Sequence, residues 1–204
     1  MHKLIYFHGF GSSGATGTAE SLRRMLNPTY DPQHGIFEDT VQVLSPDIPV
    51  DPAEALPFLR QYCEQEQPDL IIGTSMGGMY AQQMFGFRKI CVNPAFNMST
   101  MSKVLKTGEH TFFNRRKDGQ KTFRITRDII QHHNMMERQQ FKGITPFDRE
   151  NTWGLFGIHD DQVNTYDLFR KYYTQAQRFD GEHRLNERVL RTTIVPLIQQ
   201  ILTT

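Results

Sequence analysis

The chain has 204 residues, of which 38% are hydrophobic and 22% are charged, and its formal net charge is +1. This composition is typical of a soluble globular protein and excludes a disordered chain, and the length suits one domain with a substantial core. A net charge so close to zero provides no field that would attract nucleic acid or an anionic membrane. We therefore expect a single domain over residues 1–204 that acts on a small molecule.

Strand-like and helix-like segments alternate along the first half of the chain. Short apolar runs bounded by glycine or proline predict strands at residues 3–7, 41–49, 69–73 and 89–93. Helical spacing of apolar residues predicts helices between them, at residues 18–27, 53–67 and 76–86, with Pro57 in or near the first turn of the second helix. Such a series predicts a mostly parallel, doubly wound sheet with helices on both faces and an active site beyond the carboxyl ends of the strands.

The alternation of strand-like and helix-like segments ends after Pro94. Residues 96–150 are polar and basic with no clear strand, so we interpret them as a lid-like insertion into the domain. The series then resumes with a strand at 152–158, a helix at 165–175, a short strand at 176–180 and a closing helix at about 185–202. Pro196 is expected to produce a kink in that last helix.

Two further features bear on the cellular compartment. Cys63 and Cys91 have neither the spacing nor the setting of a disulfide or zinc framework, so both are expected to be buried as small hydrophobic residues. The apolar run near the N-terminus covers only residues 3–7, too few for a signal peptide or a membrane span. We expect a cytoplasmic location without a membrane partner.

Residues 70–80 read LIIGTSMGGMY, in which Gly73, Ser75 and Gly77 form a Gly-x-Ser-x-Gly pattern. The pattern follows one expected strand and opens an expected helix, which is the context of a nucleophile elbow. Such a turn needs glycine where a side chain would clash with neighbouring elements, and the helix N-terminus favours developing negative charge. We therefore interpret Ser75 as a candidate nucleophile.

A serine nucleophile needs a general base, and the base needs an orienting acid. In folds that carry a nucleophile elbow, the chain order is serine, then acid, then histidine. His183 is the histidine that follows the last expected loop bearing acids, which makes it the candidate base. Asp160 and Asp161 both follow the strand at 152–158. We choose Asp161, because a valine two residues later matches an acid-x-Val arrangement common in such folds, and we keep Asp160 as the alternative.

Acyl transfer also needs two N–H donors aimed at the oxyanion. The backbone of Met76, directly after the candidate nucleophile, is one expected donor. The backbone of Phe10 is the other, because it lies in the glycine-rich loop FHGFGSSG that follows the first strand. That loop lacks both Gly-x-Gly-x-x-Gly and a Gly-Lys-Ser/Thr ending, which argues against a phosphate-binding loop. His8 is expected to brace this loop rather than to take part in the chemistry.

The sequence resembles the α/β-hydrolase superfamily, and more closely the small YqiA-like esterase family, in the motifs YFHGFGSS, GTSMGG, VNPAF, HDDQVNTYDLFRKYY and DGEHRL. These motifs follow in the family's order and cover nearly the whole chain. The resemblance implies an α/β-hydrolase fold and a triad of Ser75, Asp161 and His183. It also implies activity on carboxylic esters or acyl thioesters, and no cofactor or metal is expected.

Other functions remain open at this point. A non-catalytic protein that binds a small ligand in the same pocket is one, and an acyltransferase or peptidase with the same triad is another. Metal-assisted hydrolysis through His8, His159 and Asp160 would need a ligand spacing that the sequence does not show.

Overall fold

A computed structural model of the protein describes residues 1–27, 41–98 and 105–203. They contain a six-stranded sheet in the order β2-β1-β3-β4-β7-β8, in which every neighbouring pair is parallel. The strands are β1 (His2–Phe7), β2 (Val41–Leu44), β3 (Leu70–Thr74), β4 (Lys89–Val92), β7 (Thr152–Gly157) and β8 (Ala176–Phe179). The expected alternation of strands and helices is thus confirmed.

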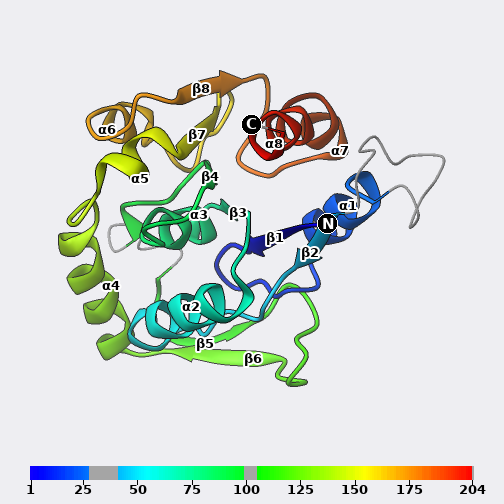
Figure 1. The fold of residues 1–204 in the computed structure, drawn as a ribbon. Helices are drawn as coiled ribbons and strands as arrows, with labels where there is room; N and C mark the ends of the chain where they lie inside the picture. The colour runs from blue at the N-terminus through cyan, green and yellow to red at the C-terminus, as the bar shows by residue number, and fades with distance from the viewer. Residues whose placement is uncertain (28–40, 99–104, 204) are drawn as a thin grey trace.

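Helices cover both faces of this sheet because alternate strand residues are apolar on each side. In β1, Leu4 and Tyr6 face one cluster of buried side chains, whereas Ile5 and Phe7 face the other. The first cluster contains residues of α1 (Gly17–Met25) and of the C-terminal helices. The second contains residues of α2 (Pro52–Glu66), α3 (Met76–Gln82), α4 (Arg127–Gln139) and α6 (Tyr166–Arg170). The two groups of helices lie on opposite sides of the sheet (Figure 1).

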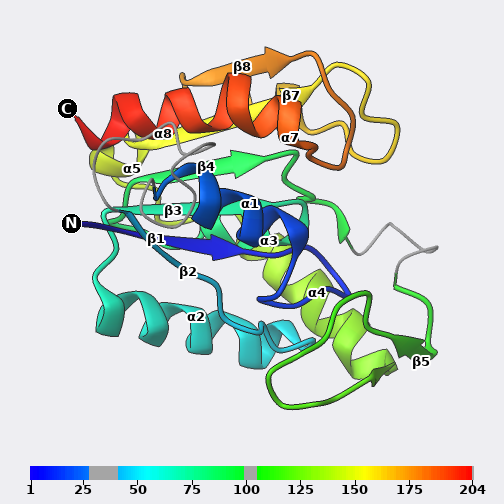
Figure 2. The same ribbon diagram turned by 90° about the vertical axis from the view of Figure 1, so that its right-hand side faces the viewer.

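The parallel strands all end at one edge of the sheet (Figure 2). The loops that follow β1, β3, β7 and β8 therefore emerge at the same edge, as the sequence predicted for the candidate site. No helix within the described ranges is both long and apolar enough to span a bilayer.

Pro57 lies in the interior of α2 and not in its first turn, which Asp51 caps and Pro52 opens. The proline removes the N–H that would bond to the carbonyl of Ala53, one turn earlier. Ala53 and Pro57 are both exposed, so water can satisfy that carbonyl and the helix continues past the proline.

The region expected to lack strands contains an antiparallel hairpin, β5 (Gly108–Thr111) and β6 (Thr122–Ile125), which lies beside the carboxyl edge of the sheet (Figure 2). That expectation was wrong because each strand is only four residues long and half exposed, so neither forms a continuous apolar run. Residues 99–104 of the expected insertion lie outside the described residues. The helices α4 and α5 (Pro146–Glu150) follow the hairpin.

A buried ion pair joins α5 to the sheet. Lys89 Nζ, on the first residue of β4, lies 2.6 Å from Asp148 Oδ1, and both side chains are fully buried. Burial lowers the pKa of Lys89. Burial would raise the pKa of Asp148, but hydrogen bonds from Lys89 and Thr145 outweigh it and hold that pKa below its usual value. Removal of either partner would leave an unpaired buried charge and lower the stability of the fold. The pair therefore ties α5 to the amino-end edge of the sheet.

The closing helix is interrupted. It consists of α7 (Glu187–Val189), a π-helical segment at Leu190–Ile194 and α8 (Val195–Leu202). Pro196 lies in the first turn of α8, where its missing N–H removes a hydrogen bond that a continuous α-helix would need. A kink was expected at Pro196; the structure has instead a π-helical segment that ends just before it, at Ile194.

Both cysteines are buried and unpaired, as expected. Burial raises the pKa of Cys63 and of Cys91 to about 12. Each thiol therefore stays protonated and packs as a small apolar group.

Candidate active site

Ser75 lies between the end of β3 and the start of α3, in a strained backbone conformation. Its φ of 55° and ψ of −120° lie where residues other than glycine are uncommon, and such strain clusters at functional sites. Its N–H donates to the carbonyl of Val92, at 2.9 Å, which ties the turn to the neighbouring strand. This geometry is that of the expected nucleophile elbow.

The two glycines of the pattern are required by close backbone contacts. A Cβ on Gly73 would lie 2.1 Å from the carbonyl oxygen of Gly77, and one on Gly77 would lie 2.1 Å from the carbonyl oxygen of Phe7. Any side chain at either position would therefore force α3 away from β1 and β3. The glycines let α3 start immediately above the strand ends, with Ser75 at its first turn.

His183 reaches Ser75 from the loop that follows β8. Its Nε2 lies 3.0 Å from Ser75 Oγ, and its side chain is 11% exposed. These two residues are 108 positions apart in the chain and meet only because their strands end at the same edge. The structure thus brings together the candidate nucleophile and base chosen from the sequence.

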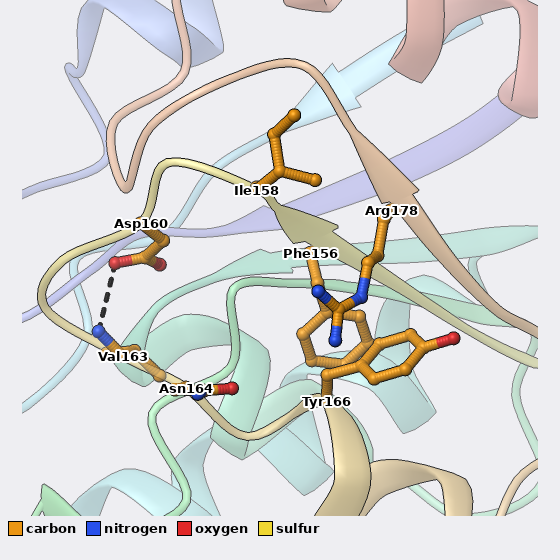
Figure 3. A pocket seen from close by; sticks show the side chains of 8 residues that line it. Phe156, Ile158, Asp160, Val163, Asn164, Tyr166 and Arg178 are labelled. Carbon is orange, nitrogen blue, oxygen red and sulfur yellow. Dashed lines mark hydrogen bonds between the residues drawn. The ribbon is translucent and has the colours of Figure 1, made fainter.

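The carboxylate that contacts His183 belongs to Asp160 and not to Asp161. Asp160 Oδ2 lies 2.8 Å from His183 Nδ1, and the Asp160 side chain is 2% exposed, whereas Asp161 is exposed. The other oxygen of Asp160 accepts the N–H groups of Gln162, at 2.8 Å, and Val163, at 2.9 Å. The bond to Val163 is drawn in Figure 3. These two bonds close the turn over Asp160. The choice of Asp161 was wrong, because it is Asp160 that contacts His183.

The turn around Asp160 also borders a small cavity of about 90 Å³. Val163 and Asn164 line it on one side, and Arg178 from β8 stacks on the Tyr166 ring at the other, 4.2 Å from its centroid (Figure 3). Both residues of this stack line the cavity.

The two backbone segments that carry the expected oxyanion donors lie next to Ser75. Met76 is the first residue of α3, so its N–H has no acceptor within the helix. The loop that contains Phe10 lies against the nucleophile, because a Cβ on Gly9 would lie 3.6 Å from Ser75 Cβ. Both backbone segments thus lie next to Ser75, and their role as oxyanion donors stays a prediction.

His8 braces this loop. It is 2% exposed, and burial lowers its pKa to about 4, so its ring is neutral near pH 7. Its Nδ1 lies 2.8 Å from the carbonyl oxygen of Gly9, and its Nε2 accepts the N–H of Ile48 at 3.0 Å. A neutral ring with its proton on Nδ1 satisfies both contacts, as expected for a structural histidine.

The β5–β6 hairpin holds the same loop from outside, a role that the sequence did not indicate. The N–H of Phe113 donates to the carbonyl of Gly11 at 2.8 Å, and Ser13 Oγ donates to the carbonyl of Arg115 at 2.8 Å. The Phe113 ring is 72% exposed and rests on Gly11, where a Cβ would lie 3.1 Å from it. An exposed aromatic side chain therefore lies at the rim of the site, beside the loop of Phe10.

The residues considered for a metal site are engaged elsewhere. His8 braces the loop, and His159 Nε2 lies 3.2 Å from Asp180 Oδ1 at the surface. Within the described ranges no group of three His, Cys, Asp or Glu side chains is arranged to hold a metal ion.

A family model described as an uncharacterised protein family, UPF0227, matches residues 3–189. The chain belongs to this family. The motifs that carry the resemblance to the YqiA-like proteins all fall within the matched residues.

Several solved structures share the fold of this chain at low sequence identity. Est1E from Butyrivibrio proteoclasticus is 13% identical with a TM-score of 0.65, over 100% of this chain and 89% of its own. A protein from Xanthomonas campestris pv. campestris, described as an alpha/beta superfamily hydrolase, is 12% identical with a TM-score of 0.58, over 100% and 98%. A thioesterase domain from the curacin biosynthetic pathway is 14% identical with a TM-score of 0.52, over 98% and 91%. The member of UPF0227 described here therefore has the α/β-hydrolase fold.

Proposed function

We propose that this protein is a serine hydrolase that cleaves a carboxylic ester or an acyl thioester through an acyl-enzyme. One observation carries the proposal. The ring of His183 spans from Ser75 Oγ, at 3.0 Å from Nε2, to Asp160 Oδ2, at 2.8 Å from Nδ1. A base placed between a serine hydroxyl and a buried carboxylate is the arrangement that activates serine for attack on an acyl carbon.

In the acylation step, Ser75 Oγ attacks the acyl carbon while His183 Nε2 takes the hydroxyl proton. The Asp160 carboxylate accepts the Nδ1–H bond, which sets the tautomer and stabilises the imidazolium. The backbone N–H groups of Phe10 and Met76 donate to the oxyanion of the tetrahedral intermediate. His183 then returns the proton to the alcohol or thiol as its bond to the acyl carbon breaks.

In the deacylation step, water takes the place of the leaving group. His183 removes a proton from the water, which attacks the ester carbon of the acyl-enzyme, and then returns that proton to Ser75 Oγ. The products are a carboxylic acid and the free serine, so no cofactor or metal is required.

The support for this function comes from the site and from its place in the fold. Ser75, Asp160 and His183 each follow a strand of one parallel sheet. The solved structures with a similar fold include one titled Est1E and a thioesterase domain. Fold alone does not fix a reaction, so the geometry of the three side chains carries the weight.

The test compares wild-type protein with Ser75→Ala, and with Ser21→Ala as a matched loss of a buried serine hydroxyl on α1. A fluorophosphonate probe should label wild-type protein and Ser21→Ala at one site and leave Ser75→Ala unlabelled. Hydrolysis of a panel of activated esters, acyl thioesters and peptides should follow the same pattern and rank the substrate classes. A folded wild-type protein that no probe labels would instead favour a binding protein, and full activity in Ser75→Ala would exclude Ser75 as the nucleophile.

A further inference from the structure

The turn Asn93–Pro94–Ala95 follows β4, which lies between the strand of Ser75 and the strand that precedes Asp160. His183 follows β8, one strand farther out. The loop that carries His183 must therefore cross the ends of β7 and β4 to meet Ser75. The turn after β4 therefore contacts the loop that carries His183.

The side chain of Asn93 holds the crossing loop by its backbone. It is 2% exposed, and its Nδ2 donates to the carbonyl of Glu182 at 3.0 Å and to the carbonyl of His183 at 3.2 Å. Its Oδ1 accepts the N–H of Gly157, the last residue of β7, at 2.8 Å. One amide group thus links the base loop to the strand from which the acid loop begins.

The rest of the turn contacts the other two parts of the site. The N–H of Ala95 donates to the carbonyl of Ser75 at 3.1 Å. Thr165, which follows the acid loop, donates its hydroxyl to the carbonyl of Pro94 at 2.7 Å. The three residues of the turn therefore contact the nucleophile, the acid loop and the base loop together.

The residue type at position 93 fits this task in two ways. Its φ is 43°, in the left-handed region that asparagine tolerates better than most residues other than glycine. A primary amide also supplies two donor hydrogens and an acceptor from one short side chain, which matches the two carbonyls and one N–H that surround it. An aspartate of the same size would lack the donors and place negative charge against the two carbonyls.

We propose that Asn93 is a positioning residue that holds His183 in line between Ser75 and Asp160. This inference rests on the proposed serine hydrolase function. Without the Asn93 amide, the carbonyls of residues 182 and 183 lose their two bonds to the turn after β4, and the ring of His183 is no longer held at the Ser75 hydroxyl. A displacement of about 1 Å at a catalytic group can lower a rate by about 100-fold.

Two variants distinguish the role of the Asn93 amide from that of its left-handed backbone conformation. Asn93→Gly keeps the left-handed conformation without strain and removes the amide, whereas Asn93→Asp keeps the size and the acceptor and removes the donors. The matched control is Thr152→Val, which deletes a buried bond from Thr152 Oγ1 to the carbonyl of Asp148, at 2.7 Å, at the opposite end of β7. All three variants lose at least one buried hydrogen bond, so thermal unfolding of each gives the temperature at which every variant remains folded.

Two measurements are made at that temperature. The first is the rate of fluorophosphonate labelling at Ser75 as a function of pH. The second is the proton and nitrogen NMR spectrum of the His183 ring, assigned by comparison with His183→Gln, which reports the hydrogen bonds at both ring nitrogens without any turnover.

We expect Asn93→Gly and Asn93→Asp to be labelled about 100-fold more slowly, with a changed pH profile and a weakened Nδ1–H signal, while Thr152→Val keeps both near wild type. Labelling within about threefold of wild type in folded Asn93 variants, or an equal loss in Thr152→Val, would overturn the role of Asn93. If wild-type protein is not labelled, the proposed function fails, and the His183 spectrum alone decides whether Asn93 positions the ring.

Discussion

Asp160 holds His183 through Oδ2, at 2.8 Å from Nδ1, while its other oxygen is held by two N–H groups of its own turn. The carboxylate therefore cannot rotate away from the imidazole without losing those bonds. The adjacent Asp161 is exposed to solvent. This difference reverses the choice of Asp161 over Asp160 that was made from the sequence, and it leads to the first prediction.

Asp160→Asn should lower the rate of ester hydrolysis by about 10⁴-fold, because an amide in place of the carboxylate favours the wrong tautomer of His183. The amide oxygen can still accept the N–H groups of Gln162 and Val163, so the turn should keep its shape. Asp161→Asn is the matched control and should stay within a few-fold of wild type. Steady-state kinetics on an activated ester measures both, and the reverse ranking would reassign the acid.

Gly77→Ala should damage both stability and activity. The new Cβ would lie 2.1 Å from the carbonyl oxygen of Phe7, so α3 has to move away from β1. We expect a loss of about 1–3 kcal/mol or more in the free energy of unfolding, because overpacking against backbone relaxes poorly. The start of α3 also carries the N–H of Met76, so labelling of Ser75 should slow as well.

The control for this substitution is Gly17→Ala, at the first residue of α1, where no atom lies within 4 Å of the added Cβ. Urea unfolding should show Gly17→Ala at wild-type stability or slightly above. Equal stability of Gly77→Ala and wild type would contradict the close packing of α3 on β1.

Phe113→Ala should change substrate preference without loss of stability. The ring is 72% exposed and rests on the loop that contains Phe10, so we expect it to contact the acyl or alcohol part of a substrate. Its removal should lower kcat/KM by about tenfold for esters with long apolar groups and leave short acetyl esters nearly unchanged.

Phe147→Ala is the matched control for the rim. Phe147 is also exposed, at 44%, but it lies on α5, next to the Asp148 that pairs with the amino end of β4. A series of esters of increasing chain length distinguishes the two variants. The same chain-length profile in Phe113→Ala and wild type would remove Phe113 from the substrate site.

His133 should make the protein sensitive to acid. Its ring is fully buried on α4, neither nitrogen has a hydrogen-bond partner among the described residues, and burial lowers its pKa to about 4. The unfolded chain, with a histidine pKa of about 6.5, takes up the proton first. The free energy of unfolding is therefore highest above about pH 6.5, and the contribution of His133 to it is lost as the pH falls toward about 4.

His133→Leu should leave stability at pH 7 unchanged or raise it, because no hydrogen bond is lost. It should also flatten the fall in unfolding free energy between about pH 6.5 and 4. Part of the fall should persist, because burial also lowers the pKa of His8 to about 4. His159→Gln, at an exposed histidine, is the control, and urea unfolding across this pH range is the measurement. An unchanged slope in His133→Leu would contradict the role of His133.

Much of the fold could be predicted from local patterns. The strands are short apolar runs, and α1 and α2 start after Thr16 and Asp51, two residue types that often cap helices. The hairpin escaped prediction because its strands are short, polar and half exposed, and they are stabilised by contacts with the loop of Gly11 rather than by an apolar pattern of their own. Asn93 escaped because nothing in a strand that ends in Asn-Pro indicates which loops will cross above it.

The sequence by itself determined the order of the elements that form the parallel sheet and its flanking helices, and the positions in the chain of Ser75 and His183. The position of Ser75 follows from local sterics, because a strand that turns at once into a helix needs small residues such as Gly73 and Gly77 around the turn. The position of His183 follows from the order of residues along the chain. Only the tertiary structure decided between Asp160 and Asp161 and placed Asn93 under the base loop. Both depend on where the backbone after β7 and β8 meets across the sheet edge, and contacts between residues 23 or 90 positions apart leave no pattern in a single sequence.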